Sequence, residues 1–262
     1  MGYKVFDSLV HITKNGKWYS TNYDASIERL NKEFDSYLEK ALLVGMPGDD
    51  LKYLMDVANK NKGRLIPIAP IVFNKNTSIE EIEKQIIDFK NRGFKGIKIH
   101  PRFLNTNLSD KKIIDSIRIA GKYNLVSMLC TIHRYPSPPL KRPVHDVLYE
   151  ICYKTQNSKL ILLHGGYYDL LSTSELIRNF ESVLLDLSLI SIRFKNTSLK
   201  NDIQFLFETF DKRICVGSDF PEYTTTDLVK TLLNDYNFQF VNIEKKSNIL
   251  YNNLDSFFKG LI

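Results

Sequence analysis

The segment GIKIHPRFLNTNLSDKKIIDSIRIAGKYNLVSMLCT, residues 96–131, contains one complete strand–helix–strand unit. Gly96–His100 is a short strand-like run that Pro101 stops, and Val126–Thr131 is a second run of the same kind. Between them, Ser109–Lys122 has the apolar spacing of a helix. This order predicts two parallel strands joined by a crossover helix.

The same alternation extends over the rest of the chain. The other predicted strands are Tyr3–Ile12, Ala41–Met46, Leu65–Phe73, Lys159–His164, Val183–Ser188 and Arg213–Ser218. The other predicted helices are Ser26–Leu38, Asp49–Asn59, Ser78–Arg92, Val144–Tyr153, Tyr168–Phe180, Leu199–Phe210, Thr224–Asn234 and Ile243–Phe258. Eight strands, each followed by a helical segment, in about 250 residues predict a (β/α)8 TIM barrel of the α/β class. We therefore expect a single domain over residues 1–262.

A doubly wound open sheet is the alternative fold. Its glycine fingerprint should follow the first strand, but the segment from Asp7 to His11 contains no glycine. The barrel is therefore the preferred prediction.

The composition is that of a soluble globular protein, with 43% hydrophobic and 25% charged residues. No apolar run approaches the ~18 residues of a membrane span, and the first residues lack the layout of a signal peptide. The three cysteines, Cys130, Cys152 and Cys215, are scattered, which favours a reduced, cytoplasmic protein. The net charge of +6 favours a small anionic partner, and we expect no nucleic-acid or membrane partner.

Histidines gather at the carboxyl ends of the predicted strands. His11, His100 and His164 end strands, and His133 follows one closely, so four of the five histidines belong to one rim of the barrel. Asp219 follows the last predicted strand. Active sites of such barrels lie at this rim. Imidazole and carboxylate together predict a metal site or a general acid–base site.

Basic side chains belong to the same rim. The candidate substrate-binding residues are His100, Lys98, Arg102, His133 and Arg134. Because guanidinium groups bind carboxylates and phosphates in a forked geometry, this set favours an anionic substrate. The alternatives are a packed His100, solvated loop arginines, and a buried Lys98 paired with a carboxylate such as Asp186.

Four motifs occur in the order typical of one known family. They are Gly93-Phe-Lys-Gly-Ile-Lys-Ile-His-Pro101, Leu162-Leu-His-Gly-Gly166, Arg213-Ile-Cys-Val-Gly-Ser-Asp-Phe-Pro221 and Ile249-Leu-Tyr-Asn-Asn-Leu254. They resemble the strand-four, strand-six, strand-eight and closing-helix motifs of the amidohydrolase superfamily, in its decarboxylase-like, amidohydrolase-2 branch. The strand-eight motif is the most specific of the four, and together they cover nearly the full length of the chain.

The resemblance implies a metal held by an Asp-x-His-x-His pattern on strand one, a His on strand five and an Asp on strand eight. Asp219 and His164 match the family's strand-eight Asp and strand-six His, and His11 matches the second His of strand one. Leu9 stands where the first His is expected, and Cys130 stands where the strand-five His is expected. A Cys thiolate binds zinc or iron well, so the implied metal ligands are His11, Cys130 and Asp219, with one open water position.

The resemblance thus implies a hydrolase that cleaves an amide, ester or lactone of a small anionic molecule. Asp219 would be the general base, His164 an acid/base or oxyanion partner, and a divalent metal such as zinc would activate the water. Three alternatives remain: a metal-independent lactonase-type hydrolase, a metal-dependent decarboxylase, and a catalytically inactive barrel that acts as a binding protein. Asp7 is interpreted as a structural residue of the strand-one turn, and the resemblance also allows a homodimer.

Overall fold

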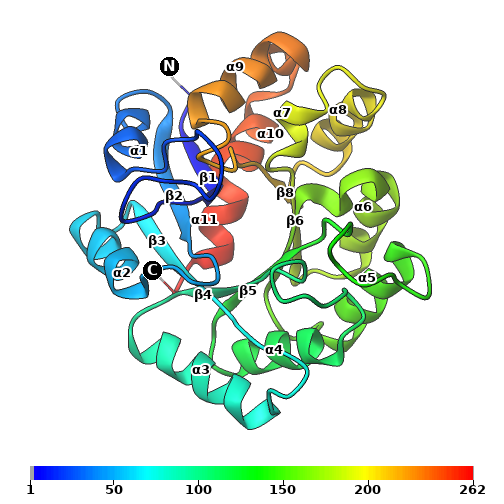
Figure 1. Ribbon diagram of the computed structural model, residues 1–262. Coiled ribbons are helices and arrows are strands. Elements are labelled where there is room, and N and C mark those ends of the chain that lie inside the picture. Colours follow the sequence, from blue (N-terminus) through cyan, green and yellow to red (C-terminus); the bar gives the residue numbers. More distant parts are fainter. Residues whose placement is uncertain (1–2, 262) are drawn as a thin grey trace.

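The computed structural model describes residues 3–261 and contains one eight-stranded sheet whose strands lie in sequence order (Figure 1). Every neighbouring pair is parallel. The strands are β1 (Val5–Val10), β2 (Leu38–Val44), β3 (Leu65–Pro70), β4 (Gly96–Ile99), β5 (Val126–Cys130), β6 (Leu160–Leu163), β7 (Val183–Asp186) and β8 (Ile214–Cys215). Residues 1, 2 and 262, which belong to the predicted domain, lie outside the described part, as does the start of the stretch considered for a signal peptide.

The first and last strands meet and close the sheet. Ser8 N donates to Val216 O over 3.1 Å, and His11 N donates to Phe220 O over 2.9 Å. These bonds join β1 to the segment that follows β8. The predicted (β/α)8 barrel is therefore confirmed, and the open doubly wound sheet is not formed.

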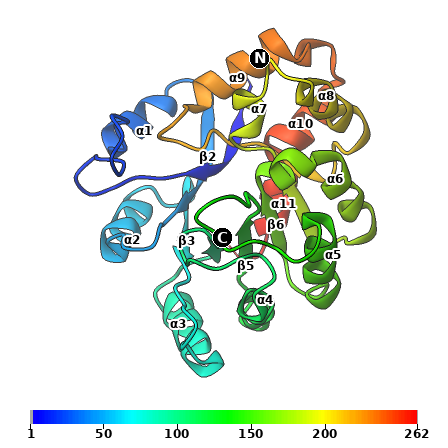
Figure 2. The same cartoon turned by 45° about the vertical axis from the view of Figure 1, so that its right-hand side comes forward.

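Helices surround the barrel in a ring, which Figures 1 and 2 show from two directions. They are α1 (Ile27–Glu33), α2 (Leu51–Lys60), α3 (Ile79–Asn91), α4 (Lys111–Lys122), α5 (Val144–Lys154), α6 (Leu170–Asn179), α7 (Ile190–Arg193), α8 (Leu199–Thr209), α9 (Thr225–Asp235), α10 (Ile243–Ser247) and α11 (Asn253–Phe258). Within residues 3–261, no helix has both the length and the apolar character needed to cross a membrane.

Two predicted helices differ from the structure. The helix predicted over Ser26–Leu38 is too long, because α1 ends at Glu33 and the buried Leu38 already begins β2. The helix predicted over Ile243–Phe258 is interrupted by a π-helical turn at Asn248–Asn252. At this turn Asn253 Nδ2 donates to two carbonyl oxygens before and within β8, which ties the chain to the barrel base.

The interior of the barrel is apolar. Its cluster contains Phe6, Leu9, Leu42, Val44, Ile66, Ile68, Val126, Met128, Ile161, Leu163, Leu184 and Cys215. Leu254 and Phe258 of α11 join this cluster, so the last helix packs against the barrel interior. The polar residues that follow the strands therefore lie over a dry core, where charges are poorly solvated.

Candidate active site

His11, which follows β1, is held in one tautomer. Its Nδ1 lies 2.5 Å from the carbonyl oxygen of Val44, which can only accept, so Nδ1 carries the proton. Nε2 therefore presents its lone pair to the barrel mouth, where Lys98 Nζ donates to it over 3.2 Å. Burial and the charge of Lys98 hold the pKa of His11 well below its usual value, so the imidazole is neutral.

Lys98, on β4, is only 3% exposed. Its amine contacts His11 Nε2 and lies 3.5 Å from the sulfur of Met46. Burial lowers the pKa of Lys98, while the charge of Asp219 opposes that shift. The alternative ion pair with Asp186 is not formed, and that carboxylate instead accepts hydrogen bonds from the hydroxyls of Ser8 and Ser188.

Asp219 approaches the same histidine from the segment after β8. Its Oδ1 lies 3.7 Å from His11 Nε2, and its side chain is 19% exposed. Its backbone has a positive φ of 60°, and its N–H donates to Leu9 O over 3.0 Å, which fixes the turn against β1. Burial raises the pKa of Asp219 to about 7, although the charge of Lys98 opposes the shift.

His164 begins a turn in which four consecutive residues have positive φ, from His164 to Tyr167. Its Nδ1 faces Ser188 O at 3.2 Å, so the proton lies on Nδ1 and the Nε2 lone pair is free. Burial lowers the pKa of His164 to about 3. Of the roles expected for His164, this tautomer favours a hydrogen-bond acceptor or base over an oxyanion donor.

Asp7 lies on β1 and joins the two ends of the barrel. It accepts hydrogen bonds from Leu9 N at 3.1 Å, Ser218 N at 3.0 Å and Thr225 Oγ1 at 2.8 Å. Burial raises the pKa of Asp7 to about 6. These bonds match the structural role that the sequence suggested.

The residues implied as metal ligands do not fit a metal ion. Within residues 3–261, no three His, Cys, Asp or Glu side chains are placed to hold one. Cys130 is fully buried, and burial raises the pKa of its thiol, whereas a metal binds the thiolate. Lys98 Nζ lies against the His11 lone pair that a metal would need, and Leu9 packs in the barrel core. In this arrangement the three implied ligands do not form a metal site, and metal binding by His11, Cys130 and Asp219 stays a prediction.

Three of the predicted substrate-binding residues belong to this centre. Lys98 contacts His11. Burial lowers the pKa of His100 most strongly, and the charges of Lys98 and Arg102 lower it further. The Nδ1 of His100 and the Nε of Arg102 are buried without a hydrogen-bond partner. Both atoms therefore keep a hydrogen-bonding capacity that the rest of the protein does not use.

The other two predicted residues lie in the loop after β5. His133 is half-buried and its Nδ1 has no hydrogen-bond partner, while Arg134 is exposed. Burial lowers the pKa of His133. The structure therefore places His133 and Arg134 at the periphery and not in the His11–Lys98 centre.

An arc of aromatic rings, formed by Trp18, Tyr19 and Phe103, was not predicted from the sequence. Trp18 stacks on His11 with ring centroids 5.0 Å apart and contacts Tyr19 at 4.7 Å. Tyr19 contacts Phe103 at 5.5 Å, and Phe103 contacts His100 at 4.6 Å. The arc thus runs from His11 to His100. In the sequence, the adjacent pair Trp18-Tyr19 inside an otherwise polar loop was the feature that could have indicated this arc.

Arg193, on α7, is a second residue that the sequence did not single out. It forms an ion pair with Glu222, and its charge affects the pKa of both His164 and Asp219. Arg193 lies on α7, and a helix of only four residues is too short to show the apolar spacing that predicts a helix from sequence.

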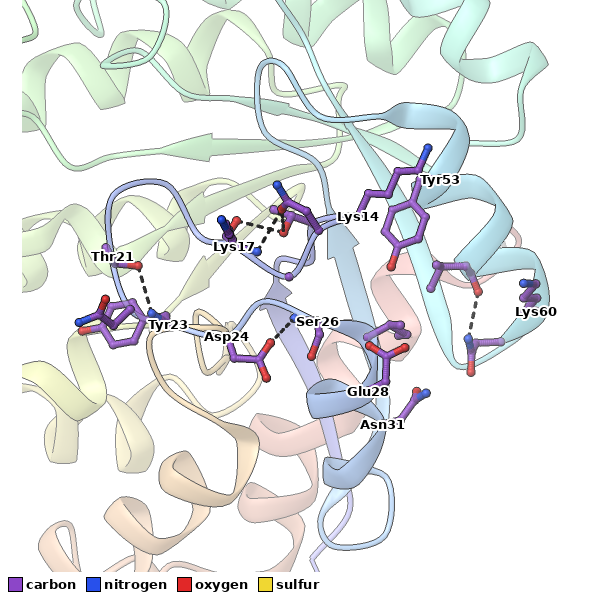
Figure 3. A pocket seen from close by; sticks show the side chains of 17 residues that line it. Lys14, Lys17, Thr21, Tyr23, Asp24, Ser26, Glu28, Asn31, Tyr53 and Lys60 are labelled. Carbon is purple, nitrogen blue, oxygen red and sulfur yellow. Dashed lines mark hydrogen bonds between the residues drawn. The ribbon is translucent and has the colours of Figure 1, made fainter.

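Cavities adjoin the loop that follows β1. One of about 1260 Å³ is lined by Lys14, Lys17, Tyr53, Lys60 and other mostly polar residues, as Figure 3 shows. A second of about 380 Å³ shares three of these four residues and reaches Trp18. None of the predicted site residues lines either cavity.

A family model described as Amidohydrolase matches residues 31–253. The chain belongs to this amidohydrolase family. The match begins after β1, so Leu9 and His11 lie outside it. Three of the four motifs lie wholly within it, and the closing-helix motif does so except for Leu254.

Solved structures resemble this amidohydrolase in fold. An uncharacterized TIM-barrel protein, Bb4693 from Bordetella bronchiseptica, superposes with a TM-score of 0.81 at 11% identity, covering 97% of this chain and 98% of that one. A zinc-bound amidohydrolase from Burkholderia multivorans gives 0.68 at 12% identity, covering 98% and 99%. The 5-carboxyvanillate decarboxylase LigW from Sphingomonas paucimobilis gives 0.65 at 8% identity, covering 98% and 99%. The search of curated proteins found no match.

Proposed function

We propose that this amidohydrolase cleaves an ester, lactone or amide of a small carboxylate-bearing molecule, with water activated by Asp219 and without a metal ion. One observation carries the proposal. Lys98 Nζ and Asp219 Oδ1 lie 3.2 Å and 3.7 Å from the same His11 nitrogen, so a carboxylate and a buried N–H donor lie close to one atom at the carboxyl ends of the strands. Because His11, Cys130 and Asp219 are not arranged to hold a metal ion, we propose a reaction that uses only the protein's own side chains.

The reaction follows from where each proton can go. Asp219 takes a proton from water as the water oxygen attacks the carbonyl carbon, and the carbonyl electron pair moves onto its oxygen. Lys98 Nζ donates a hydrogen bond to that oxygen. When the tetrahedral intermediate breaks down, the protonated Asp219 returns its proton to the leaving alcohol or amine.

Two further residues orient the reactants. The Nε2 of His164 accepts the second proton of the water in a hydrogen bond, since its Nδ1 is already committed to Ser188 O. The unpaired Nε of Arg102 binds the substrate carboxylate. A base is most effective when its pKa is near the working pH, and the pKa of Asp219 is raised to about 7 by burial.

Metal-assisted hydrolysis or decarboxylation is the second candidate. The His11 tautomer, with the proton on Nδ1 and none on Nε2, is the one that a metal ligand also needs. Structures of similar fold include one described as zinc-bound and one described as a decarboxylase with manganese. In this chain, however, Lys98 would first have to leave Nε2.

The test is hydrolysis of small carboxylate-bearing esters, lactones and amides by untagged protein before and after treatment with a metal chelator. We expect equal rates before and after, and loss of activity in Asp219→Asn. Asp56→Asn, at an exposed position on α2, is the matched control and should behave as wild type. Activity that disappears with the chelator and returns with zinc or manganese would reject the metal-free reaction in favour of the second candidate. No hydrolysis with any probe would favour a binding protein.

A further inference from the structure

A cavity of about 250 Å³ lies at the amino-terminal ends of β3 and β4. Its walls come from the end of α2, from Leu65–Pro67 at the start of β3, and from the turn that joins α3 to β4. The proposed active site lies at the other end of the barrel, because Lys98 and His100 belong to the carboxyl end of β4. A ligand in this cavity would therefore leave the proposed active site unoccupied.

The floor of this cavity is apolar. Ala58 of α2 and Leu65 and Pro67 of β3 line it, and all three are buried. Met55 lines it as well, and the methyl carbon of Met55 lies 3.4 Å from the position that a Cβ on Gly93 would take. The turn after α3 is thus packed against α2. A hydrocarbon group that enters the cavity would be removed from water, which favours its binding.

Three cationic residues, Lys62, Arg92 and Lys95, line the same cavity, and no Asp or Glu among residues 3–261 does so. Arg92 forms an i,i+4 ion pair with Asp88 at 3.4 Å, whereas Lys62 and Lys95 form no ion pair with the described residues at 4.0 Å or less.

The helix ends account for only part of this charge. Lys62 and Arg92 follow the carboxyl ends of α2 and α3, where the helix dipole favours a cation, but Lys95 belongs to neither helix. An anion placed among the three residues would be attracted by each of them and would offset their mutual repulsion. The cavity therefore combines an apolar floor with a cationic edge.

We propose that this cavity binds a small amphipathic carboxylate. Its hydrocarbon chain lies on the apolar floor, and its carboxylate group lies among Lys62, Arg92 and Lys95. The guanidinium of Arg92 suits a carboxylate because its N–H groups form a fork that matches the two oxygens. The cavity is slightly smaller than the ~300 Å³ at which pockets for drug-sized molecules begin, so the ligand has a short chain. This site goes beyond the proposed hydrolysis and does not depend on it.

The test is a titration of octanoate into protein whose methionine methyl groups carry carbon-13, observed by nuclear magnetic resonance. Met55 lines the cavity, whereas the sulfur of Met46 lies 3.5 Å from Lys98 Nζ at the proposed active site. Octanoate should shift the Met55 methyl signal in a saturable way and leave the Met46 signal in place. 1-Octanol, which has the same chain without the charge, should bind more weakly.

Charge variants test the contribution of the cationic edge. Removing two of the three cations in the double variant Arg92→Gln, Lys95→Gln should weaken octanoate binding by about tenfold, measured from the Met55 shift. Lys90→Gln is the matched control, because Lys90 is exposed on α3 and does not line the cavity. It should bind octanoate as the wild type does.

Three outcomes would overturn the proposal. The first is a saturable shift of Met46 without one of Met55, which would place the carboxylate at the proposed active site. The second is no saturable shift of Met55 in the folded wild type. The third is equal affinity of the double variant and the wild type. Because Met46 and Met55 report on the two ends of the barrel separately, failure of this site leaves the test of the proposed hydrolysis unaffected.

Discussion

Lys98 Nζ lies 3.2 Å from His11 Nε2, so a buried amine meets the lone pair that the family resemblance gives to a metal ion. The same histidine nitrogen lies 3.7 Å from the carboxylate of Asp219. Charge on Lys98 therefore acts directly on the carboxylate that we propose as the base. The pH dependence of the proposed hydrolysis should therefore be sensitive to the Lys98 side chain.

The first prediction concerns the pH profile of hydrolysis. Because burial raises the pKa of Asp219 to about 7 and the base must be ionised, activity should rise as the pH increases through about 7. The charge of Lys98 lowers that pKa, so Lys98→Met should move the midpoint to higher pH as well as reduce the rate. The measurement is the rate on the best ester or lactone probe as a function of pH.

Lys90→Met, at an exposed position on α3, is the control for this profile and should leave the midpoint unchanged. A midpoint in Lys98→Met that equals that of wild type would show that Lys98 does not act on the base. A midpoint at lower pH would contradict the stated sign.

Asp7 should make the free energy of unfolding fall as the pH rises, which is the opposite of the usual effect of a carboxylate. Burial raises its pKa from 3.8 to about 6 in the folded state, so the folded protein binds more protons than the unfolded chain between these values. The contribution of this group to the free energy of unfolding therefore falls, by up to about 3 kcal/mol, as the pH rises through that window. Asp7→Asn should remove this component, seen as a flatter curve in urea unfolding between about pH 4 and about pH 6.

Asp7→Ala is the companion variant. It leaves two buried N–H groups and the Thr225 hydroxyl without their acceptor, so we expect a loss of about 3 kcal/mol, well beyond that of Asp7→Asn. Equal stability of the two variants would contradict the role of Asp7 as the link between β1 and the segment after β8.

Gly166 should tolerate no side chain. Its φ is 80°, and an added Cβ would lie 2.0 Å from Thr173 Oγ1 and 2.8 Å from Thr173 Cβ. Gly166→Ala should therefore lower the free energy of unfolding by about 3 kcal/mol through strain and clash together. Gly48→Ala, with a φ of 97° and no atom within 4 Å of the added Cβ, should cost about 1 kcal/mol. Chemical denaturation measures both, and equal losses would mean that packing against Thr173 is unimportant.

Trp18 should control solvent access to His11. Removing the indole in Trp18→Ala takes away a ring stacked 5.0 Å from the imidazole, which should hydrate His11 and raise its pKa toward the usual value. Nuclear magnetic resonance of the imidazole of His11 across pH measures this. Tyr23→Ala, at an exposed position in the same loop, is the control. An unchanged His11 pKa in Trp18→Ala would show that the indole does not shield it.

The barrel and its rim could be predicted because both depend on local pattern. Runs of strand and helix type repeat along the chain, and a parallel barrel brings the carboxyl ends of all strands together. His11, His164 and Asp219 were therefore placed at one rim from sequence alone. The interruption at Asn248–Asn252 was not predictable, since it depends on Asn253 reaching carbonyl groups of the barrel.

The chemistry of the rim could be predicted only in part. Cys130 and Lys98 are inward-facing by strand alternation, but the pattern does not say which of them meets His11. The contact between Lys98 and His11 joins residues 87 positions apart, and the stacking of Trp18 depends on how an irregular loop folds back. Burial then decides the protonation of Cys130, which no spacing of residues reveals.

The metal content of untagged protein, measured after loading with excess zinc at neutral pH and gel filtration, tests the account most directly. With Lys98 against the His11 lone pair and a protonated Cys130, we predict no stoichiometric zinc on the wild type. About one equivalent of zinc per chain, lost in both Cys130→Ala and Asp219→Ala, would contradict the proposed metal-free centre.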